Sequence, residues 1–328
     1  MSERCTVLLS SAGRRVALLE AFRHSLARMG VDGEVLAVDA SRLSAAAQLA
    51  DESFLVPHCT HDDFVPALLD ICARHEVRLV VPTIDTELPV LSEHRRTFAD
   101  VGTTVAISAP ETIAIGFDKV HTHQWLVANS FPTVRQDSPV DVLAASAAWD
   151  FPLVVKPRRG SASIGVVTVR DPEELAVAAR DRDVVVQSTA PGAEHTIDVF
   201  VDRDGLARCA VPRRRIEVRG GEVSKGVTVR AEALEVLGAS LCERLPGAYG
   251  ALNVQVFVDG DDLRVIEINA RFGGGFPLAY AAGADFPGWL VEEALGRPSS
   301  AVASEWRGGV AMLRYDDHVI VDSATLGI

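Results

Sequence analysis

Apolar residues in the first third of the chain form short runs that alternate with stretches of helical periodicity. Residues 6–9 form an apolar run, and after a small turn apolar residues recur at helical spacing over residues 16–29, where Gly30 can end the helix. Three further strands and one further helix are expected: strands at residues 35–38, 78–81 and 105–108, and a helix around residues 68–72. Because strands that alternate with helices form parallel sheets with covered faces, residues 1–115 are predicted to form a doubly wound α/β domain.

The pattern changes after a polar, alanine-rich stretch that is bracketed by two Phe-Pro pairs, at residues 131–132 and 151–152. Strands are expected at residues 153–156 and 184–188, and beyond them come pairs of apolar runs joined by tight turns. Three hairpins are predicted, with turns at Asp204-Gly205, Gly220-Gly221 and Asp259-Gly260. The second part of the chain is therefore expected to be α+β and built mostly from antiparallel strands.

The overall charge and composition narrow the classes of partner. With 32 Lys and Arg against 45 Asp and Glu among 328 residues, the formal charge is −13, so no nucleic-acid partner is expected. No apolar run approaches the ~18 residues that cross a bilayer, and the run near the start is too short for a signal peptide. We therefore expect a cytoplasmic protein with no membrane partner. The five scattered cysteines contain no Cys-x-x-Cys pair, which disfavours disulfides and zinc ribbons.

The strand expected at residues 265–271 carries polar side chains at every second position and leads into three glycines. Period-two alternation predicts two sets on opposite faces: Val265, Glu267, Asn269 and Arg271 on one, and Ile266, Ile268 and Ala270 on the other. Gln255 on the partner strand can join Glu267 and Asn269 in lining one cavity. Such oxygen ligands suit Mg²⁺ (or Mn²⁺), which takes further ligands from water and phosphate, and Arg271 could lie beside the phosphates. The alternative is an exposed polar face of an antiparallel sheet.

A Gly/Ser-rich loop at residues 160–165 lies between the strand that delivers Lys156 and a returning strand at residues 166–169. Backbone N–H groups in such a loop can cradle phosphate oxygens, and Lys156 supplies a positive charge. Because the loop lies within a hairpin and does not open a helix, it differs from a P-loop and can move as a flap. The alternative is a plain flexible turn.

Two smaller features complete this set. The β run that ends at Ser188 breaks before it resumes near His195, and backbone exposed at such a break can read the edge of an adenine ring. Glu194 could then accept hydrogen bonds from ribose hydroxyls, and the alternative is a linker between subdomains. Lys119 stands at the start of a helix after the first domain.

Together and in this order, these elements resemble the ATP-grasp superfamily over nearly the whole chain. The closest resemblance is to the carbamoyl-phosphate-synthase large-chain-like and amino-acid (carboxylate-amine) ligase members. The resemblance implies a pre-ATP-grasp domain at residues 1–115, an ATP-grasp domain at residues 116–300 with a lid subdomain at about residues 125–186, and a C-terminal strand or tail at residues 301–328. It also implies ATP and Mg²⁺ as cofactors.

The resemblance assigns roles to individual residues. The implied nucleotide contacts are Lys119, Lys156, the flap residues Gly160, Ser161, Ser163 and Gly165, the hinge residues Gln187, Ser188 and Ala190, and the ribose acid Glu194. The implied metal ligands are Gln255, Glu267 and Asn269, with Arg271 as the catalytic arginine near the γ-phosphate. Gln187 stands where a glutamate often opens the hinge, which affects only the adenine contact.

The implied activity is that of a stand-alone ligase, because the chain holds one such unit and not the tandem pair of a full carbamoyl phosphate synthase. Such an enzyme joins a small-molecule carboxylate to an amine through an acyl phosphate, and one substrate is expected to be an amino acid. Two alternatives stay open: activation of bicarbonate or carbamate, and ATP binding without turnover by a regulator or partner subunit. The oligomeric state also stays open, with a homodimer as one possibility.

Substrate contacts are expected from three places. Arg215 and Lys225, in a basic block on the second hairpin, are expected to act catalytically by binding the acyl phosphate or a substrate carboxylate; the alternative is a solvated hairpin face. Asp85 and Glu87 are expected to hold the amine, because α/β domains bind ligands at the carboxyl ends of their strands. Arg14, at the start of the first helix, could hold an anion, or it could belong to a solvated helix start.

Overall fold

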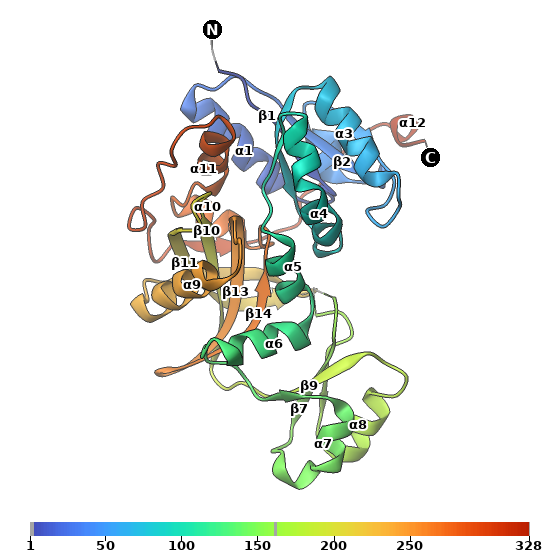
Figure 1. Ribbon diagram of the computed structural model, residues 1–328, viewed down its shortest axis with the longest axis vertical. Helices are drawn as coiled ribbons and strands as arrows, with labels where there is room; N and C mark the ends of the chain where they lie inside the picture. Colours follow the sequence, from blue (N-terminus) through green and yellow to red (C-terminus); the bar gives the residue numbers. More distant parts are fainter. Residues whose placement is uncertain (1–2, 161–162, 328) are drawn as a thin grey trace.

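The computed structural model describes residues 3–160 and 163–327, and it contains three sheets. Figure 1 shows the sheet of the N-terminal domain at one end of the long axis, a large antiparallel sheet in the middle and a small sheet at the other end. No helix within those two stretches is long and apolar enough to span a bilayer. All five cysteines are buried free thiols, as expected.

The N-terminal domain is a parallel sheet with strand order β3-β2-β1-β4-β5. Its strands are β1 (Thr6–Ser10), β2 (Val35–Asp39), β3 (Ser53–Leu55), β4 (Val77–Pro82) and β5 (Thr104–Val105). The helices along this part of the chain are α1 (Val16–Met29), α2 (Ala45–Leu49), α3 (Phe64–Arg74), the 3₁₀ turn η1 (Asp85–Glu87), α4 (Leu88–Asp100) and α5 (Pro110–Phe117). Leu8 belongs to the core under α3 and α4, whereas Val7 and Leu9 belong to the core under α1. Both faces of the sheet are therefore covered, as the alternation of strands and helices predicted.

The last strand of this sheet is shorter than the sequence suggested. β5 ends at Val105, because the chain then leaves the sheet and the Ala109 N–H donates to the Gly247 carbonyl oxygen (2.8 Å) of the next domain.

The central sheet is antiparallel throughout, with strand order β14-β13-β10-β11-β12-β15. Its strands are β10 (Ala193–Val201), β11 (Ala207–Arg219), β12 (Glu222–Thr228), β13 (Gly250–Asp259), β14 (Asp262–Asn269) and β15 (Ala311–Leu313). The helices near it are α6 (Lys119–Ala128), α9 (Glu232–Arg244), α10 (Phe276–Ala281), α11 (Phe286–Ala294) and α12 (Ser323–Leu326). The three predicted hairpins are confirmed as β10–β11, β11–β12 and β13–β14. Gly205 and Gly260 have φ values of +79° and +58°, which tight hairpin turns require and glycine adopts without strain.

A β-bulge corrects one prediction about the β13–β14 hairpin. Gln255 pairs with Glu267, but the next residue, Val256, pairs with Val265, so Ile266 is an extra residue. Such an insertion reverses the alternation on one side of it. Val265 is therefore buried in the core with Ile268 and does not share a face with Glu267.

The third sheet, which we call the lid, spans residues 136–188 with strand order β6-β9-β7-β8. Its elements are β6 (Gln136–Asp137), α7 (Pro139–Ala144), the 3₁₀ turn η2 (Ser146–Ala148), β7 (Leu153–Pro157), β8 (Val167–Val169), α8 (Pro172–Ala178) and β9 (Val184–Ser188). The lid has a small core of its own, in which Trp149 and Leu153 are buried. Helix α6 packs against β14 of the central sheet, and the first strand of the lid sheet, β6, follows it in the chain.

Candidate functional site

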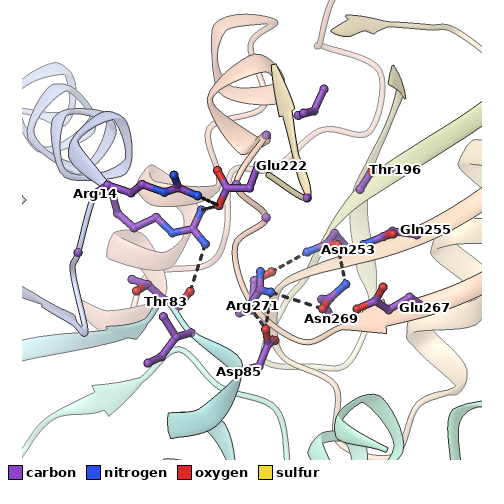
Figure 2. A pocket seen from close by; sticks show the side chains of 18 of the residues that line it. Arg14, Thr83, Asp85, Thr196, Glu222, Asn253, Gln255, Glu267, Asn269 and Arg271 are labelled. Carbon is purple, nitrogen blue, oxygen red and sulfur yellow. Dashed lines mark hydrogen bonds and ion pairs between the residues drawn. The ribbon is translucent and has the colours of Figure 1, made fainter. Parts of the chain in front are cut away.

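Two cavities meet at the β13–β14 hairpin. The lid cavity, of about 380 Å³, lies between the lid and the hairpin, and the central cavity, of about 290 Å³, lies between the hairpin and loops of the N-terminal domain (Figure 2). Both are close to the size of small-molecule sites. Gln255 and Glu267 line both cavities, so they form the boundary between them.

The predicted metal ligands do lie together. Gln255 and Glu267 are directly opposite on neighbouring strands, and Asn269 is opposite Asn253 (Figure 2). The Asn269 Nδ2 donates to Asn253 Oδ1 (3.2 Å), and Asn253 Nδ2 donates to the Arg271 carbonyl oxygen (3.1 Å). These bonds fix both amide groups and leave the Asn269 Oδ1 turned toward the Arg271 guanidinium (3.5 Å).

This donor set fits a hard divalent cation that also binds a phosphate. It offers one carboxylate and two amide oxygens, and Mg²⁺ uses few protein carboxylates when phosphate and water supply the other ligands. Within the parts of the chain that the structure describes, no three His, Cys, Asp or Glu side chains could hold a metal by themselves.

Arg271 and Asp85 connect the central sheet to the N-terminal domain. Arg271 Nε donates to Asp85 Oδ1 (2.8 Å) and Nη2 donates to Oδ2 (2.6 Å), a two-point contact between groups that are both mostly buried. The sequence suggested separate roles for these side chains, one near phosphate and one near an amine. The structure brings them together at the wall of the central cavity.

The lid cavity holds two lysines. Lys156, at the end of β7, is mostly surrounded by protein, and burial lowers the pKa of its ammonium, while the nearby Glu267 acts in the opposite direction. Lys119, at the start of α6, donates from Nζ to the Gly160 carbonyl oxygen (2.9 Å). Asp118, the N-cap of α6, accepts from Arg158 Nε at 2.7 Å, which ties this helix to the end of β7.

The predicted hinge also lines the lid cavity. Gln187, Ser188 and Ala190 are among its lining residues, and Gln187 Nε2 donates to Gln136 Oε1 (2.8 Å) in the neighbouring strand. This bond holds the Gln187 side chain against β6, and the residues that follow it, Ser188, Thr189 and Ala190, continue the lining of the cavity.

Glu194 lines the lid cavity and is paired with an arginine. Its Oε1 forms an ion pair with Arg215 Nη1 (2.9 Å), and burial raises the pKa of Glu194 although Arg215 opposes that effect. Arg215 is itself more than nine-tenths buried and lines the central cavity, and its Nε has no hydrogen-bond partner. A buried donor without a partner is costly, and the same guanidinium also donates from Nη2 to the Gly221 carbonyl oxygen (3.1 Å).

The flap residues divide into three groups. Gly160 and Ser163 line the lid cavity. Gly165 is not among the lining residues, and its carbonyl oxygen accepts from Arg182 Nη2 (2.8 Å). Ser161 lies outside the described residues.

The central cavity is lined by further arginines besides Arg215 and Arg271. Arg14 is 76% exposed, whereas Arg15 is 18% exposed and both approach Glu222, at 3.3 and 3.9 Å. Burial lowers the pKa of Arg15, and the nearby Arg271 adds to that effect. Arg213 is fully buried in an ion pair with Asp198. Arg14 was expected to meet an anion from its place at the start of the first helix, and the structure adds its neighbour Arg15, since both line the central cavity.

Two predicted substrate residues do not face the cavities. Lys225 is exposed, and its Nζ donates to Glu217 Oε2 (2.7 Å) on the neighbouring strand, so it is paired away from the central cavity. Glu87 is completely buried under the loop after β4. Its carboxylate accepts from the Ser10 and Ser11 hydroxyls (2.5 and 2.9 Å), so it holds the loop and does not contact a ligand.

Comparison with known proteins identifies the family. Residues 7–106 match the model of the PylC-like N-terminal domain, and residues 180–317 match the model of ATP-grasp in the biosynthetic pathway with Ter operon. The D-alanine–D-alanine ligase of Stutzerimonas stutzeri is 32% identical over 203 residues, which cover 53% of this chain and 62% of the ligase. That of Kineococcus radiotolerans is 31% identical over 212 residues, which cover 52% of this chain and 55% of the ligase. The chain therefore spans less than two thirds of the length of these relatives.

Solved structures share the architecture across nearly the whole chain. N5-carboxyaminoimidazole synthetase from Staphylococcus aureus, complexed with ADP, has a TM-score of 0.71 at 16% identity and covers 92% of this chain and 80% of its own. The biotin carboxylase domain of the Hydrogenobacter thermophilus 2-oxoglutarate carboxylase, in complex with MgADP and bicarbonate, has a TM-score of 0.71 at 18% identity and covers 95% of this chain and 74% of its own. With a PylC-like N-terminal domain and an ATP-grasp domain behind it, the chain belongs to the ATP-grasp superfamily.

Proposed function

We propose that the protein is an ATP-dependent carboxylate-amine ligase that uses Mg²⁺ and forms an amide or peptide bond through an acyl phosphate. The observation that carries this proposal is the boundary formed by Gln255 and Glu267, which line the lid cavity and the central cavity at once. Nucleotide phosphates bound on the lid side would lie next to a substrate on the central side. The relatives named as D-alanine–D-alanine ligases support this class of reaction, and the neighbours that hold ADP or MgADP support the nucleotide.

The lid cavity has the groups that a nucleotide needs. Lys119 and Lys156 would neutralise phosphate charge, the backbone beyond Gln187 would meet the adenine edge, and Glu194 would meet the ribose. Mg²⁺ would be held by the oxygens of the donor set, Gln255, Glu267 and Asn269, and would offset the negative charge of the transferring phosphoryl group. Phosphoryl transfer depends mostly on positioning and charge neutralisation, so no side-chain nucleophile is required.

The proposed reaction has two balanced steps. A carboxylate oxygen of the first substrate attacks the γ-phosphorus of ATP, the bond between the γ-phosphorus and the β–γ bridging oxygen breaks, and ADP leaves. The amine nitrogen of the second substrate then attacks the acyl carbon, the carbon–oxygen bond to phosphate breaks, and phosphate leaves with the loss of one amine proton. Arg215 and Arg271 lie at the wall of the central cavity, where they would stabilise the acyl phosphate.

An ADP-release assay tests this function. Purified protein with Mg-ATP is given pools of amino acids and small carboxylic acids, and the pools are then divided until one acid–amine pair remains. We expect ADP to appear in proportion to an amide product identified by mass spectrometry. Tight binding of Mg-ATP with no ADP from any pair would contradict the ligase and favour a non-catalytic nucleotide-binding subunit.

Bicarbonate activation is a second candidate, because the neighbouring 2-oxoglutarate carboxylase domain is described with bicarbonate bound. An enzyme of this kind would release ADP when bicarbonate is supplied without any amine. Release of ADP that depends on both a carboxylic acid and an amine, and not on bicarbonate, would exclude it.

A further inference from the structure

A third cavity opens beside the central cavity, and we call it the C-terminal cavity because the segment around β15 forms one of its walls. Its volume is about 500 Å³, against about 290 Å³ for the central cavity. Three helices, α1, α2 and α10, and the β15 segment supply its apolar lining, which includes Ala17, Leu18, Leu49, Phe276, Met312 and Tyr315. Of these residues, Tyr315 is 77% exposed, whereas Leu18 and Phe276 are buried.

The wall made by the C-terminal segment is held in place by the central sheet. Met312 pairs with Gly226 in β12, and the Arg314 N–H donates to the Ser224 carbonyl oxygen (2.8 Å). The Arg219 guanidinium pairs with the Asp316 carboxylate, with Nη1 to Oδ2 at 3.0 Å. The wall formed by the C-terminal segment is therefore fixed by backbone pairing and by an ion pair.

Charged side chains stand where the C-terminal cavity joins the central cavity. Arg14, Arg15 and Glu222 line both cavities, and Arg314 lines the C-terminal cavity. Glu222 meets three guanidinium groups, with Oε2 at 2.8 Å from Arg314 Nη1 and Oε1 at 3.3 Å from Arg14 Nη2. Around Glu222 three guanidinium groups meet one carboxylate, which favours an anionic ligand group, and guanidinium groups bind carboxylates well. The C-terminal cavity is also lined by Asp316, which is paired with Arg219, and by Asp317. Glu222 can at the same time accept from an ammonium group.

We propose that the amine substrate is an α-amino acid with a large apolar side chain. Its carboxylate would lie among the guanidinium groups at the junction, its amino group would point into the central cavity, and its side chain would fill the C-terminal cavity. An α-amino acid combines one carboxylate, one amino group and one side chain at a single carbon, which is the combination that the junction and the two cavities offer. This inference rests on the proposed ligase function and specifies its second substrate.

Direct binding to the full chain tests the substrate class separately from turnover. Isothermal titration in saturating Mg-ADP compares glycine with both enantiomers of leucine and phenylalanine. We expect one enantiomer of leucine or phenylalanine to bind at least tenfold more tightly than glycine, because its side chain leaves water on binding.

A pair of matched variants tests whether the side chain of the bound amino acid lies in the C-terminal cavity. Ala17→Phe places a ring in the C-terminal cavity and is expected to reduce the ratio of leucine to glycine affinity at least fivefold. Ala27→Phe changes an exposed alanine of the same helix outside the three cavities, and it is expected to leave that ratio unchanged. Thermal unfolding midpoints of both variants confirm that each is folded.

The outcomes separate this inference from the ligase proposal. Three results would overturn the inference. These are equal affinity for glycine and the large amino acids, no binding of any amino acid, and a reduction of the leucine-to-glycine affinity ratio in Ala27→Phe as large as that in Ala17→Phe. ADP release with glycine or polar amines alone would overturn it while the ligase proposal stands. Selective binding of leucine without ADP release from any pair would instead reject the ligase and keep the assignment of the cavity.

Discussion

Glu267 is the side chain that most directly connects the two parts of the candidate site. It is directly opposite Gln255 across the hairpin, it lines both main cavities, and it lies close enough to Lys156 to oppose the effect of burial on the pKa of that lysine. A carboxylate in this place can bind a cation and balance a lysine. The charge of Glu267 should therefore contribute more to metal-dependent activity than the shape of its side chain.

Replacing Glu267 with glutamine tests this point, because the change removes the charge and keeps the size. We expect Glu267→Gln to lower Mg²⁺-dependent ADP release roughly 100-fold or more, since even outer partners of metal sites are worth 10–100-fold. Initial rates are measured across a range of Mg²⁺ concentrations. Asp262→Asn, an exposed carboxylate at the start of the same strand, is the control, and turnover near the wild-type level in Glu267→Gln would contradict the metal assignment.

Lys156 gives a prediction about pH. Burial lowers its pKa below the ordinary value of 10.5, so the ammonium loses its proton at a lower pH than an exposed lysine does. The charged form binds phosphate, so affinity for Mg-ATP should fall as the pH rises through the lowered pKa. Loss of a charged hydrogen bond predicts a decrease of roughly tenfold or more. In Lys156→Arg the guanidinium stays charged, so affinity measured by fluorescence titration should no longer fall as the pH rises. If the wild type and Lys156→Arg show the same dependence of Mg-ATP affinity on pH, Lys156 does not bind phosphate.

For single residues, the sequence predicted which side chains lie together within one hairpin, but not which side chains from distant segments contact one another. Gln255, Glu267 and Asn269 were expected to lie together, because strand alternation and a tight turn determine which residues are opposite. Lys225 and Glu87 were misplaced, because their contacts depend on neighbouring segments that composition does not reveal.

At the scale of elements, Asp118 joins helix α6 to strand β7. Its carboxylate accepts from the Val120 N–H (3.0 Å) as a helix cap and from the Arg158 guanidinium. Burial alone would raise the pKa of Asp118, but the hydrogen bonds from Arg158 and Val120 hold it below its usual value. Because Lys119 begins α6 and Lys156 lies in β7, this one carboxylate keeps the two lysines in a fixed relation.

Asp118→Ala should therefore weaken both stability and nucleotide binding. Loss of the cap predicts a decrease of about 1 kcal/mol in the free energy of unfolding at neutral pH, and KM for ATP should rise several-fold. The native carboxylate has the lower pKa, so its contribution is present above pH 3.8 and is lost as the pH falls through the lowered native pKa. Urea titrations from pH 7 to pH 3 should show the free energies of unfolding of the wild type and Asp118→Ala approaching each other as the pH falls. Asp150→Ala, an exposed residue of the lid, should change neither quantity.

Elements with a strong local pattern were predicted well, and short or irregular ones were not. Helix α1 and the three hairpins have clear periodicity and glycine turns. The bulge at Ile266 has no local marker, so the faces of Val265 and Ile266 were exchanged. Strand β15 has three residues, and its pairing with β12 is determined by the arrangement of the whole sheet.

At the scale of the whole molecule, the contact between Arg271 and Asp85 joins two domains. These residues are 186 positions apart in the sequence, and the two-point contact lies at the wall of the central cavity. No pattern in either segment indicates that they meet. Whether the two residues meet depends on the relative position of the domains, and that position is set by packing along the whole interface.

A double-mutant cycle measures how far this contact couples the domains. Asp85→Asn and Arg271→Lys each remove the two-point geometry, and the double variant should lose less than the sum of the single losses. We expect a coupling of about 1–3 kcal/mol in the free energy of unfolding, which is typical of residues in one ionic contact. Additive effects, measured by urea denaturation, would show that the domains are held together elsewhere.

The wall that Gln255 and Glu267 form between two cavities has a consequence for equilibrium measurements. A ligand that alters this wall from one side changes the surface met by a ligand on the other. Thermodynamic reciprocity then requires each to change the dissociation constant of its counterpart by the same factor. A nucleotide that promotes substrate capture must itself be retained more firmly once the substrate has arrived, so the order of addition can alter rates but not the final degree of saturation.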